Sequence, residues 1–292
     1  MNNNITENIP EKKTYIKLLS HIRNLPSIPV VIFEVTKLLS NPMTSAADLG
    51  RIISRDQGLV AKILTVANSP FYGLPRRVST IEFAIVILGF DHIKNIVMAL
   101  SMVEAFKKND GHNWNSDSYW NHTLMAAGAA KKIADEKGYS KPGEVFTAGL
   151  LHDLGIAVIQ RYFNEEFNVI CDLVKEQQIS YLKAEEQVLG ITHQEVGQFL
   201  ANRWNLPEAL GETIANHHFP SKSEDNKILA SIVHLADFMT HQLGIGNFYW
   251  DSKIELDESI IDTLGFGSRE KLDGYINGNA ELFKKHFETV TL

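Results

Sequence analysis

The sequence is poor in cysteine, with Cys171 as the only one among 292 residues. A single thiol cannot form a disulfide within the chain, and it also excludes a metal cage built from several thiolates. Any metal that the chain binds must therefore be held by histidine, aspartate or glutamate side chains.

Long apolar runs are missing as well. No stretch approaches the ~18 uninterrupted apolar residues of a membrane helix, and the amino-terminal segment MNNNITENIPEKKTYIKLL lacks the apolar centre of a secretion signal. These absences predict a cytoplasmic protein that does not enter a membrane.

An excess of positive charge is also absent. The 28 Lys and Arg residues against 35 Asp and Glu residues give a net charge of −7, which argues against a surface built mainly to bind nucleic acid. With 44% hydrophobic and 22% charged residues, the composition is that of a folded globular protein. The length allows one large domain or two modest ones.

Apolar residues recur at spacings of three and four along most of the chain, while the alternation of a half-buried strand is hard to find. This periodicity predicts an all-α fold. Ser45 with Asp48, and Ser79 with Glu82, have the spacing of a capping box and predict two helix starts.

The polar segment KKNDGHNWNSDS, Lys107 to Ser118, interrupts the helical pattern and predicts a linker. We therefore divide the chain into an amino-terminal helical part, residues 1–108, and a larger helical part, residues 109–243. Residues 244–292 form a carboxy-terminal extension with two expected helices, starting near Asp257 and Ser268. The segment FDHIKNIVMALSMVEAF is apolar on more than one face, so the first two parts should pack together as one body.

Side chains that can bind a metal recur on the helices predicted in the second part. They are His122, the pair His152 and Asp153, His193, the pair His217 and His218, and Asp237. Adjacent residues on a helix point about 100° apart, so such pairs can share a metal only if neighbouring helices supply further ligands. The small residues Ala126 to Ala130 after His122 would let another helix approach closely. Imidazole and carboxylate ligands together suit Mn, Fe, Ni or Zn and, less well, Mg.

The other histidines do not join this set. His21, His92, His112 and His286 lie outside it in the sequence. His234 and His241 lie within the second part, but we assign them no paired carboxylate and interpret them as ordinary helix residues.

The segment GLLHDLGI, Gly149 to Ile156, resembles the HD superfamily of metal-dependent phosphohydrolases. Three further segments resemble the HDOD family, the HD-related output domain of bacterial signalling. They are LPSIP (Leu25 to Pro29), ISRDQGLVAKILTVANSPFYG (Ile53 to Gly73) and TIEFAIVILGFDHIKNIVMALS (Thr80 to Ser101). The resemblance extends from about Leu18 to Leu243 and implies a multi-helical HDOD domain.

The resemblance also implies a ligand set. His122, His152, Asp153 and Asp237 match the ligands of a mononuclear HD site. His193, His217 and His218 match the extra histidines that build a second metal position in the related HD-GYP phosphodiesterases. One or two divalent transition metal ions (Fe, Mn, Ni or Zn) are therefore expected.

Two departures from the HD-GYP pattern concern the substrate rather than the metal. Active HD-GYP relatives have a lysine directly after HDxG, where this chain has Ile156. The GYP-type element after the paired histidines is replaced by FPSKSEDNK, Phe219 to Lys227. Metal binding without hydrolysis of cyclic dinucleotides is the expected consequence.

The sequence is compatible with two functions. The first is a regulatory output protein that recognises a signalling protein or a small signalling nucleotide, and the two departures favour it. The second is a metal-dependent phosphohydrolase acting on nucleotides or cyclic dinucleotides, in which one metal activates water and the other holds phosphate oxygens. No catalytic residue is assigned; Asp153 is the candidate if the protein is active.

Overall fold

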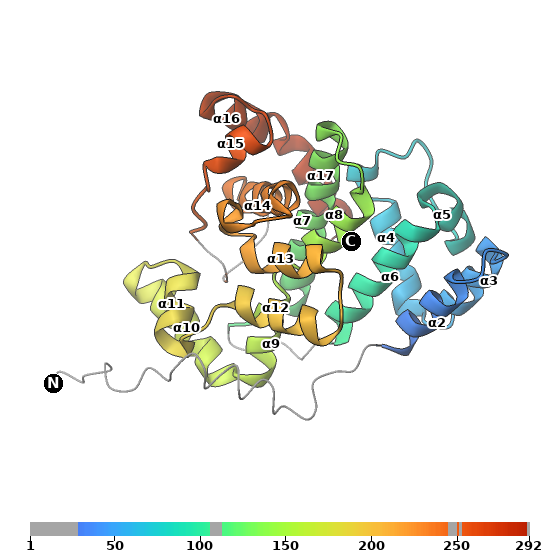
Figure 1. Cartoon of the computed structure of the whole chain (residues 1–292), viewed down its shortest axis with the longest axis horizontal. Helices are drawn as coiled ribbons and strands as arrows, with labels where there is room; N and C mark the ends of the chain where they lie inside the picture. Colours follow the sequence, from blue (N-terminus) through green and yellow to red (C-terminus); the bar gives the residue numbers. More distant parts are fainter. Residues whose placement is uncertain (1–28, 106–112, 245–249, 251–252, 291–292) are drawn as a thin grey trace.

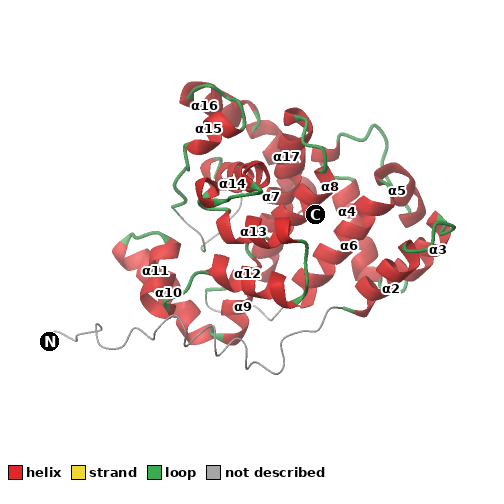
Figure 2. Ribbon diagram, viewed as in Figure 1, coloured by secondary structure: helices red, strands yellow, loops and turns green. Residues whose placement is uncertain are grey.

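The computed structural model describes residues 29–105, 113–244, 250 and 253–290 (Figure 1). Every regular element within these ranges is a helix, which confirms the predicted all-α fold (Figure 2). The boundary predicted between residues 108 and 109 lies outside the described residues, as does the first half of the predicted linker. The last residues of that linker already belong to a helix, which begins at Ser116.

The amino-terminal part consists of short helices around a longer one. They are α2 (Val30–Leu39), α3 (Ala46–Ile53), α4 (Gln57–Ala67), the 3-10 turn η1 (Pro70–Tyr72), α5 (Ile81–Leu88) and α6 (Phe90–Ala105). The predicted capping box of Ser45 and Asp48 is present at the start of α3. The cap of α5 is Thr80 rather than the predicted Ser79, because the hydroxyl of Thr80 accepts the hydrogen bond from the Phe83 N–H.

The second part is arranged around α7, which packs between α8 and α14. Its helices are α7 (Ser116–Lys137), α8 (Pro142–Leu151), α9 (Leu154–Tyr162), α10 (Asn164–Gln177), α11 (Tyr181–Leu189), α12 (His193–Arg203), α13 (Glu208–Asn216), η2 (Pro220–Lys222) and α14 (Lys227–Gln242). The helical spacing of apolar residues continues from Glu144 to Phe163 and indicates one helix, but the chain turns at His152 and Asp153. The same spacing indicates a helix from Glu208 to His218, whereas α13 ends at Asn216.

The carboxy-terminal extension contains α15 (Ser259–Thr263), α16 (Arg269–Gly278) and α17 (Ala280–Val290). The first two begin where the sequence predicted helices, but α17 was not predicted. It returns to the amino-terminal part, where Phe283 packs edge-on against Phe71 of η1 at a ring-centroid distance of 5.2 Å. The hydroxyl of Ser69 lies 2.7 Å from His286 Nδ1, so the ANSPFYG segment is a docking point for the last helix.

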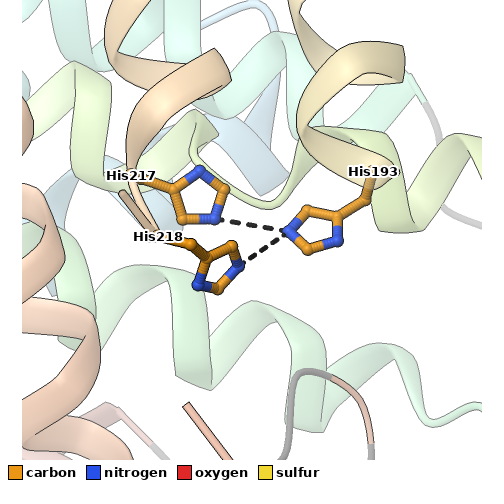
Figure 3. Close-up of side chains that lie close together, drawn as sticks. All are labelled: His193, His217 and His218. Carbon is orange, nitrogen blue, oxygen red and sulfur yellow. Dashed lines mark hydrogen bonds between the residues drawn. The ribbon is translucent and has the colours of Figure 1, made fainter. Parts of the chain in front are cut away.

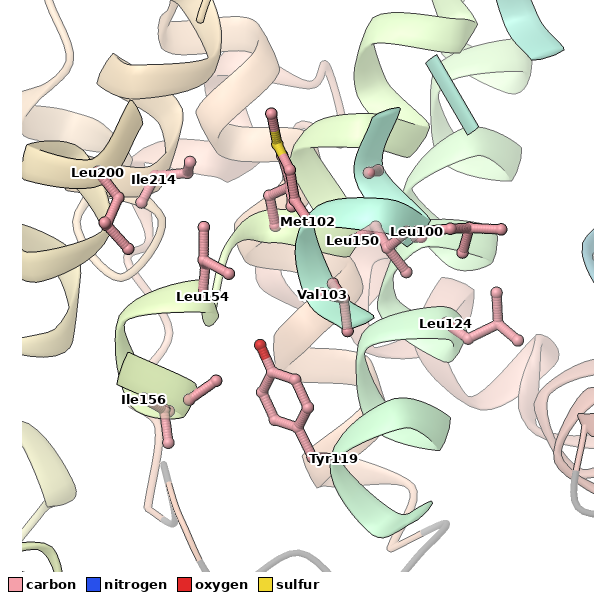
Figure 4. Close-up of a cluster of buried hydrophobic side chains, with 14 of the residues drawn as sticks. Leu100, Met102, Val103, Tyr119, Leu124, Leu150, Leu154, Ile156, Leu200 and Ile214 are labelled. Atoms are coloured by element: carbon pink, nitrogen blue, oxygen red, sulfur yellow. The ribbon is translucent and has the colours of Figure 1, made fainter. Parts of the chain in front are cut away.

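One apolar core crosses the predicted boundary between the first two parts. It extends from Ile32 in α2 through Phe146 in α8 and Leu200 in α12 to Trp250. Figure 4 shows side chains of α6 beside those of α7, α8 and α9 in this cluster. Burying one such side chain contributes roughly 1.5–3 kcal/mol, so the shared core supports the prediction that both parts form one body.

Within the described ranges, no single helix has the length and hydropathy needed to cross a membrane. Helices α5 and α6 have the required length and hydropathy only when they are counted together, and the chain bends by 119° between them.

Candidate metal centre

The turn between α8 and α9 directs two adjacent side chains toward the same point. His152 is the C-cap residue of α8. Asp153 is the N-cap residue of α9 and has a non-helical backbone, with φ −94° and ψ 13°. In a continuous helix the two side chains would diverge by about 100°. Here His152 Nε2 lies 3.4 Å from Asp153 Oδ2. His217 and His218 follow the end of α13 in the same way, so both adjacent pairs lie just beyond helix ends.

Two glycines set the distances between the helices that carry these residues. A Cβ on Gly155 would lie 1.9 Å from the carbonyl oxygen of His193, so only glycine lets α12 approach α9 this closely. A Cβ on Gly149 would lie 2.7 Å from the Cα of Ala127, which brings α8 against the small-residue stretch of α7 as predicted.

Four buried side chains form what we call the aspartate-rich group: His122 of α7, His152, Asp153 and Asp237 of α14. His122 Nε2 lies 3.2 Å from Asp153 Oδ2, 3.3 Å from Asp237 Oδ1 and 3.3 Å from His152 Nε2. His152 Nε2 lies 3.5 Å from Asp237 Oδ1. Ligand atoms arranged tetrahedrally at about 2.1 Å from a metal are about 3.4 Å apart, so this group has the spacing for one ion.

A second set, the three-histidine group, consists of His193 at the start of α12 with His217 and His218 (Figure 3). His193 Nε2 lies 3.3 Å from His217 Nε2 and 3.1 Å from His218 Nε2. Oδ1 of Asp153 lies 3.6 Å from the Nε2 atoms of both His193 and His217. Since Oδ2 of the same carboxylate belongs to the aspartate-rich group, Asp153 lies between the two groups and has the position of a bridging ligand.

The outer ring nitrogens of these histidines contact fixed partners. Nδ1 of His152 lies 2.7 Å from the Gly149 carbonyl oxygen, and Nδ1 of His217 lies 2.8 Å from the Ile214 carbonyl oxygen. Nδ1 of His193 lies 2.8 Å from Glu185 Oε2. A proton on Nδ1 serves each acceptor and leaves the Nε2 lone pair facing the centre, which is the tautomer that a metal requires.

The carboxylates of Asp153 and Asp237 are fully buried, and their oxygens accept no hydrogen bond of ordinary geometry. Imidazole nitrogens at 3.2–3.6 Å are their polar neighbours. Two carboxylates buried this way are costly unless opposite charge compensates them. Divalent cations would provide that charge, so the donor set fits a resident metal.

In the metal-free protein, the histidine pKa values are shifted in opposite directions in the two groups. Burial opposes protonation of His122, but the close contacts with the carboxylates of Asp153 and Asp237, at 3.2 and 3.3 Å, and their negative charges outweigh it and raise the pKa of His122 to about 9. In the three-histidine group, burial and the neighbouring His218 lower the pKa of His217 to about 3. Burial lowers the pKa of His218 as well. The three-histidine group therefore already contains neutral imidazoles, the form that binds metals.

Two residues near the centre were missed by sequence reasoning. Glu185 orients His193, as described above, and no local pattern marks it. His241 Nε2 lies 3.6 Å from Asp237 Oδ1 and groups with Asp237 and His122 as potential metal ligands. Our interpretation that His241 lacks a paired carboxylate is therefore wrong; the spacing of four residues on α14 was the signal.

The remaining histidines have separate surroundings. His234 links two segments, with Nδ1 2.7 Å from the His217 carbonyl oxygen and Nε2 accepting from the Asp257 N–H at 2.9 Å. His92 contacts the Tyr72 hydroxyl, and His286 contacts Ser69. His21 and His112 lie outside the described residues.

The structure shows where both departures from the HD-GYP pattern lie. Ile156 is completely buried in the apolar core, so no charged group follows the HDxG element (Figure 4). The segment after the paired histidines forms η2 and a loop that Glu212 holds to α13. Oε1 of Glu212 accepts from the N–H groups of Glu224 and Asp225 at 2.7 and 3.1 Å.

A helical arrangement of the described residues, with an HD pair at the centre of seven converging histidine and aspartate side chains, defines an HD-type domain. The HDOD domain family matches residues 25–220, and the chain belongs to this family. It is similar to the crystal structure of an HDOD domain protein of unknown function from Geobacter sulfurreducens, with 28% identity and a TM-score of 0.76. That match covers 95% of this chain and 98% of the other.

Two further relatives extend the comparison. A protein from Shewanella amazonensis, named as a candidate phosphohydrolase, has the same fold at 23% identity and a TM-score of 0.70, over 94% of this chain and 97% of the other. An uncharacterized protein from Treponema pallidum is 27% identical over 230 residues, which are 77% of this chain but 44% of that protein. The chain thus spans less than half the length of this curated relative.

Proposed function

We propose that this protein is an HDOD signal-transduction module that has kept a two-metal centre and works as a metal-loaded regulatory protein. The observation that carries the proposal is the pairing of a complete ligand set with a closed surrounding. Six of the seven ligands have no exposed surface, and the seventh, His218, keeps 4%. A complete but enclosed centre suits stable metal binding better than rapid turnover of a large substrate.

The proposed ligands divide between two ions. The aspartate-rich group would hold one ion, the three-histidine group the other, and Asp153 would bridge them. When bound, such ions supply a Lewis acid and lower the pKa of coordinated water. The mixture of imidazole and carboxylate favours Fe, Mn, Ni or Zn. The partner expected of such a module is a signalling protein or a small signalling nucleotide.

A metal-dependent phosphohydrolase is the second candidate, because a carboxylate placed between two ligand groups is what a two-metal hydrolase needs. In that case Asp153 is the residue on which activity depends. Buried Ile156 and the loop anchored by Glu212 argue against cyclic dinucleotides as substrates. We therefore expect weak hydrolysis of cyclic dinucleotides or none.

Elemental analysis of protein purified without chelator, combined with a hydrolysis screen on cyclic and linear nucleotides, tests both candidates. The regulatory proposal expects one or two transition metal ions per chain and no efficient turnover. Turnover of a cyclic dinucleotide at about 1 per second or faster, abolished by Asp153→Ala, would establish the hydrolase instead. Metal at background level after supplementation with manganese or iron would overturn both.

A further inference from the structure

A cavity of about 240 Å³, which we call the aromatic cavity, lies where the amino-terminal part meets the second part. Its walls come from α4, α6, α9, the start of α7 and the residues just before α7. None of the seven proposed metal ligands lines it. The side chains that give it its chemistry are Lys62, Glu104, Trp114, Asp117, Tyr119 and Trp120.

Three aromatic side chains form much of the wall. The ring centroids of Trp114 and Tyr119 lie 5.0 Å apart, and both residues are almost completely buried. Tyr119 lies opposite Val103 of α6, which also lines the cavity (Figure 4). Trp120, the next residue on α7, is half-buried. Rings held in place by packing favour a ligand with a flat apolar body, because stacking adds to the burial of its surface.

The charged groups in the wall have one negative charge in excess. They are the carboxylates of Glu104 and Asp117 and the ammonium group of Lys62. Lys62 forms an ion pair with Glu104. Asp117 lies exposed in the first turn of α7, and no described residue forms a salt bridge with it. The wall therefore attracts a cation more than an anion.

Lys62 shows how this wall holds a positive charge. Its Nζ atom lies 4.8 Å from the ring centroid of Trp120 and at the same time pairs with Glu104. Positively charged nitrogen over an aromatic face is the arrangement by which proteins recognise organic ammonium ions. A ligand ammonium group that enters the cavity finds the same two kinds of partner, an aromatic ring and a carboxylate.

The size of the cavity limits the ligand. A volume of about 240 Å³ equals roughly eight water molecules, since a water occupies about 30 Å³ in the liquid. The cavity therefore takes a compound of roughly eight to twelve non-hydrogen atoms, which is much smaller than a nucleotide.

We propose that the aromatic cavity binds a small organic ammonium compound with a flat apolar body, of the size of an arylalkyl amine. The body lies against Trp114, Tyr119 and Trp120, and the ammonium group lies at the carboxylates of Glu104 and Asp117. The inference goes beyond the function proposed above, because no proposed metal ligand takes part in it.

The test compares three probes of the same shape that differ in charge. Calorimetry on the full-length protein at pH 7 measures the binding of 2-phenylethylammonium, neutral 2-phenylethanol and negatively charged phenylacetate. We expect the ammonium compound to bind, the alcohol to bind at least tenfold more weakly, and phenylacetate not to bind.

Three variants place the ligand in this cavity. Trp120→Leu should weaken binding of the ammonium compound by about tenfold, through loss of the cation–π contact. Asp117→Asn should weaken it by about threefold, the effect of an exposed ion pair. Lys62→Met should strengthen it by about threefold, because the lysine no longer competes for Glu104. Asp172→Asn and Lys37→Met, at exposed positions elsewhere, are the matched controls and should leave binding unchanged.

The increase expected for Lys62→Met is the sharpest part of the test, because a variant that merely disturbs the fold would not bind the ligand more tightly. Circular dichroism of each variant checks that the helical content is retained. No binding of 2-phenylethylammonium, equal binding of all three probes, or binding that Trp120→Leu and Asp117→Asn leave unchanged would overturn the inference. Preferred binding of phenylacetate would overturn it as well, since the cavity would then select an anion.

Discussion

The two ligand groups share one carboxylate but differ in charge and in access. The aspartate-rich group combines two carboxylates with His122 and His152, is sealed from solvent and has His241 one turn away from Asp237. The three-histidine group receives one oxygen of Asp153 and borders a cavity at His218, and burial lowers the pKa values of His217 and His218 so that these two imidazoles are neutral. In the proposed centre, this difference would divide the roles: the ion of the aspartate-rich group would hold the helices together, and the ion of the three-histidine group would be the more accessible one.

The substitution Asp153→Ala should have the largest effect, because this side chain touches both groups. We expect both ions to be lost, with metal affinity falling by more than about 100-fold, while circular dichroism shows the helical content retained. Asp172→Ala, at an exposed position on α10, is the control that should keep its metal. Full metal occupancy in Asp153→Ala would contradict the claim that Asp153 is a ligand shared by the two groups.

Replacing His218 by alanine should separate the two positions. The ion of the three-histidine group should leave, because His193 and His217 alone hold it weakly, while the ion of the aspartate-rich group stays. Elemental analysis should then show about half of the original metal. Loss of both ions in equal measure would show that the positions are not independent.

His241→Ala tests the edge of the aspartate-rich group, where the partly exposed His241 side chain lies beside Asp237. We expect affinity for that ion to fall by about tenfold, the size of effect typical of a group just outside or at the edge of the coordination shell. Cobalt-substituted protein should show a changed visible absorption spectrum in this variant and an unchanged one in Gln242→Ala, the neighbouring control. An unaltered spectrum and affinity in His241→Ala would place His241 outside the centre.

The smallest expected effect concerns the loop beside His218. Burial raises the pKa of Glu212, but hydrogen bonds from Ser223, Asn226 and the Asp225 N–H outweigh this and lower it to about 2 from 4.5. A lowered pKa stabilises the fold above the unfolded value and loses this contribution as pH falls from about 4.5 toward 2. Because the side chain is largely solvated, the contribution at pH 7 is about 1 kcal/mol or less.

Urea unfolding of Glu212→Gln should therefore show a loss of stability at pH 7 that shrinks at pH 3. Glu208→Gln, an exposed carboxylate at the start of the same helix, is the matched control. A loss of equal size at both pH values would mean that Glu212 acts through packing rather than through its charge.

The sequence predicted the all-α fold because helical periodicity is local. Through residue types and the resemblance to HD proteins, it also singled out the seven side chains that the structure brings together. It did not predict the turn at His152, because apolar residues continue on both sides of it and the turn is needed only for the tertiary site. It missed α17, whose partner Phe71 is more than 200 residues away in the chain. The sequence also did not predict the cavity at His218, because the residues that line this cavity come from segments far apart in the chain.

The most direct test of the two-metal centre is a crystal structure of the protein loaded with manganese or iron, with anomalous diffraction recorded at the metal absorption edge. The account predicts two anomalous peaks on either side of the Asp153 carboxylate. One should contact His122, His152 and Asp237, and the other should contact His193, His217 and His218. An empty centre, or a single peak that Asp153 does not contact, would contradict it.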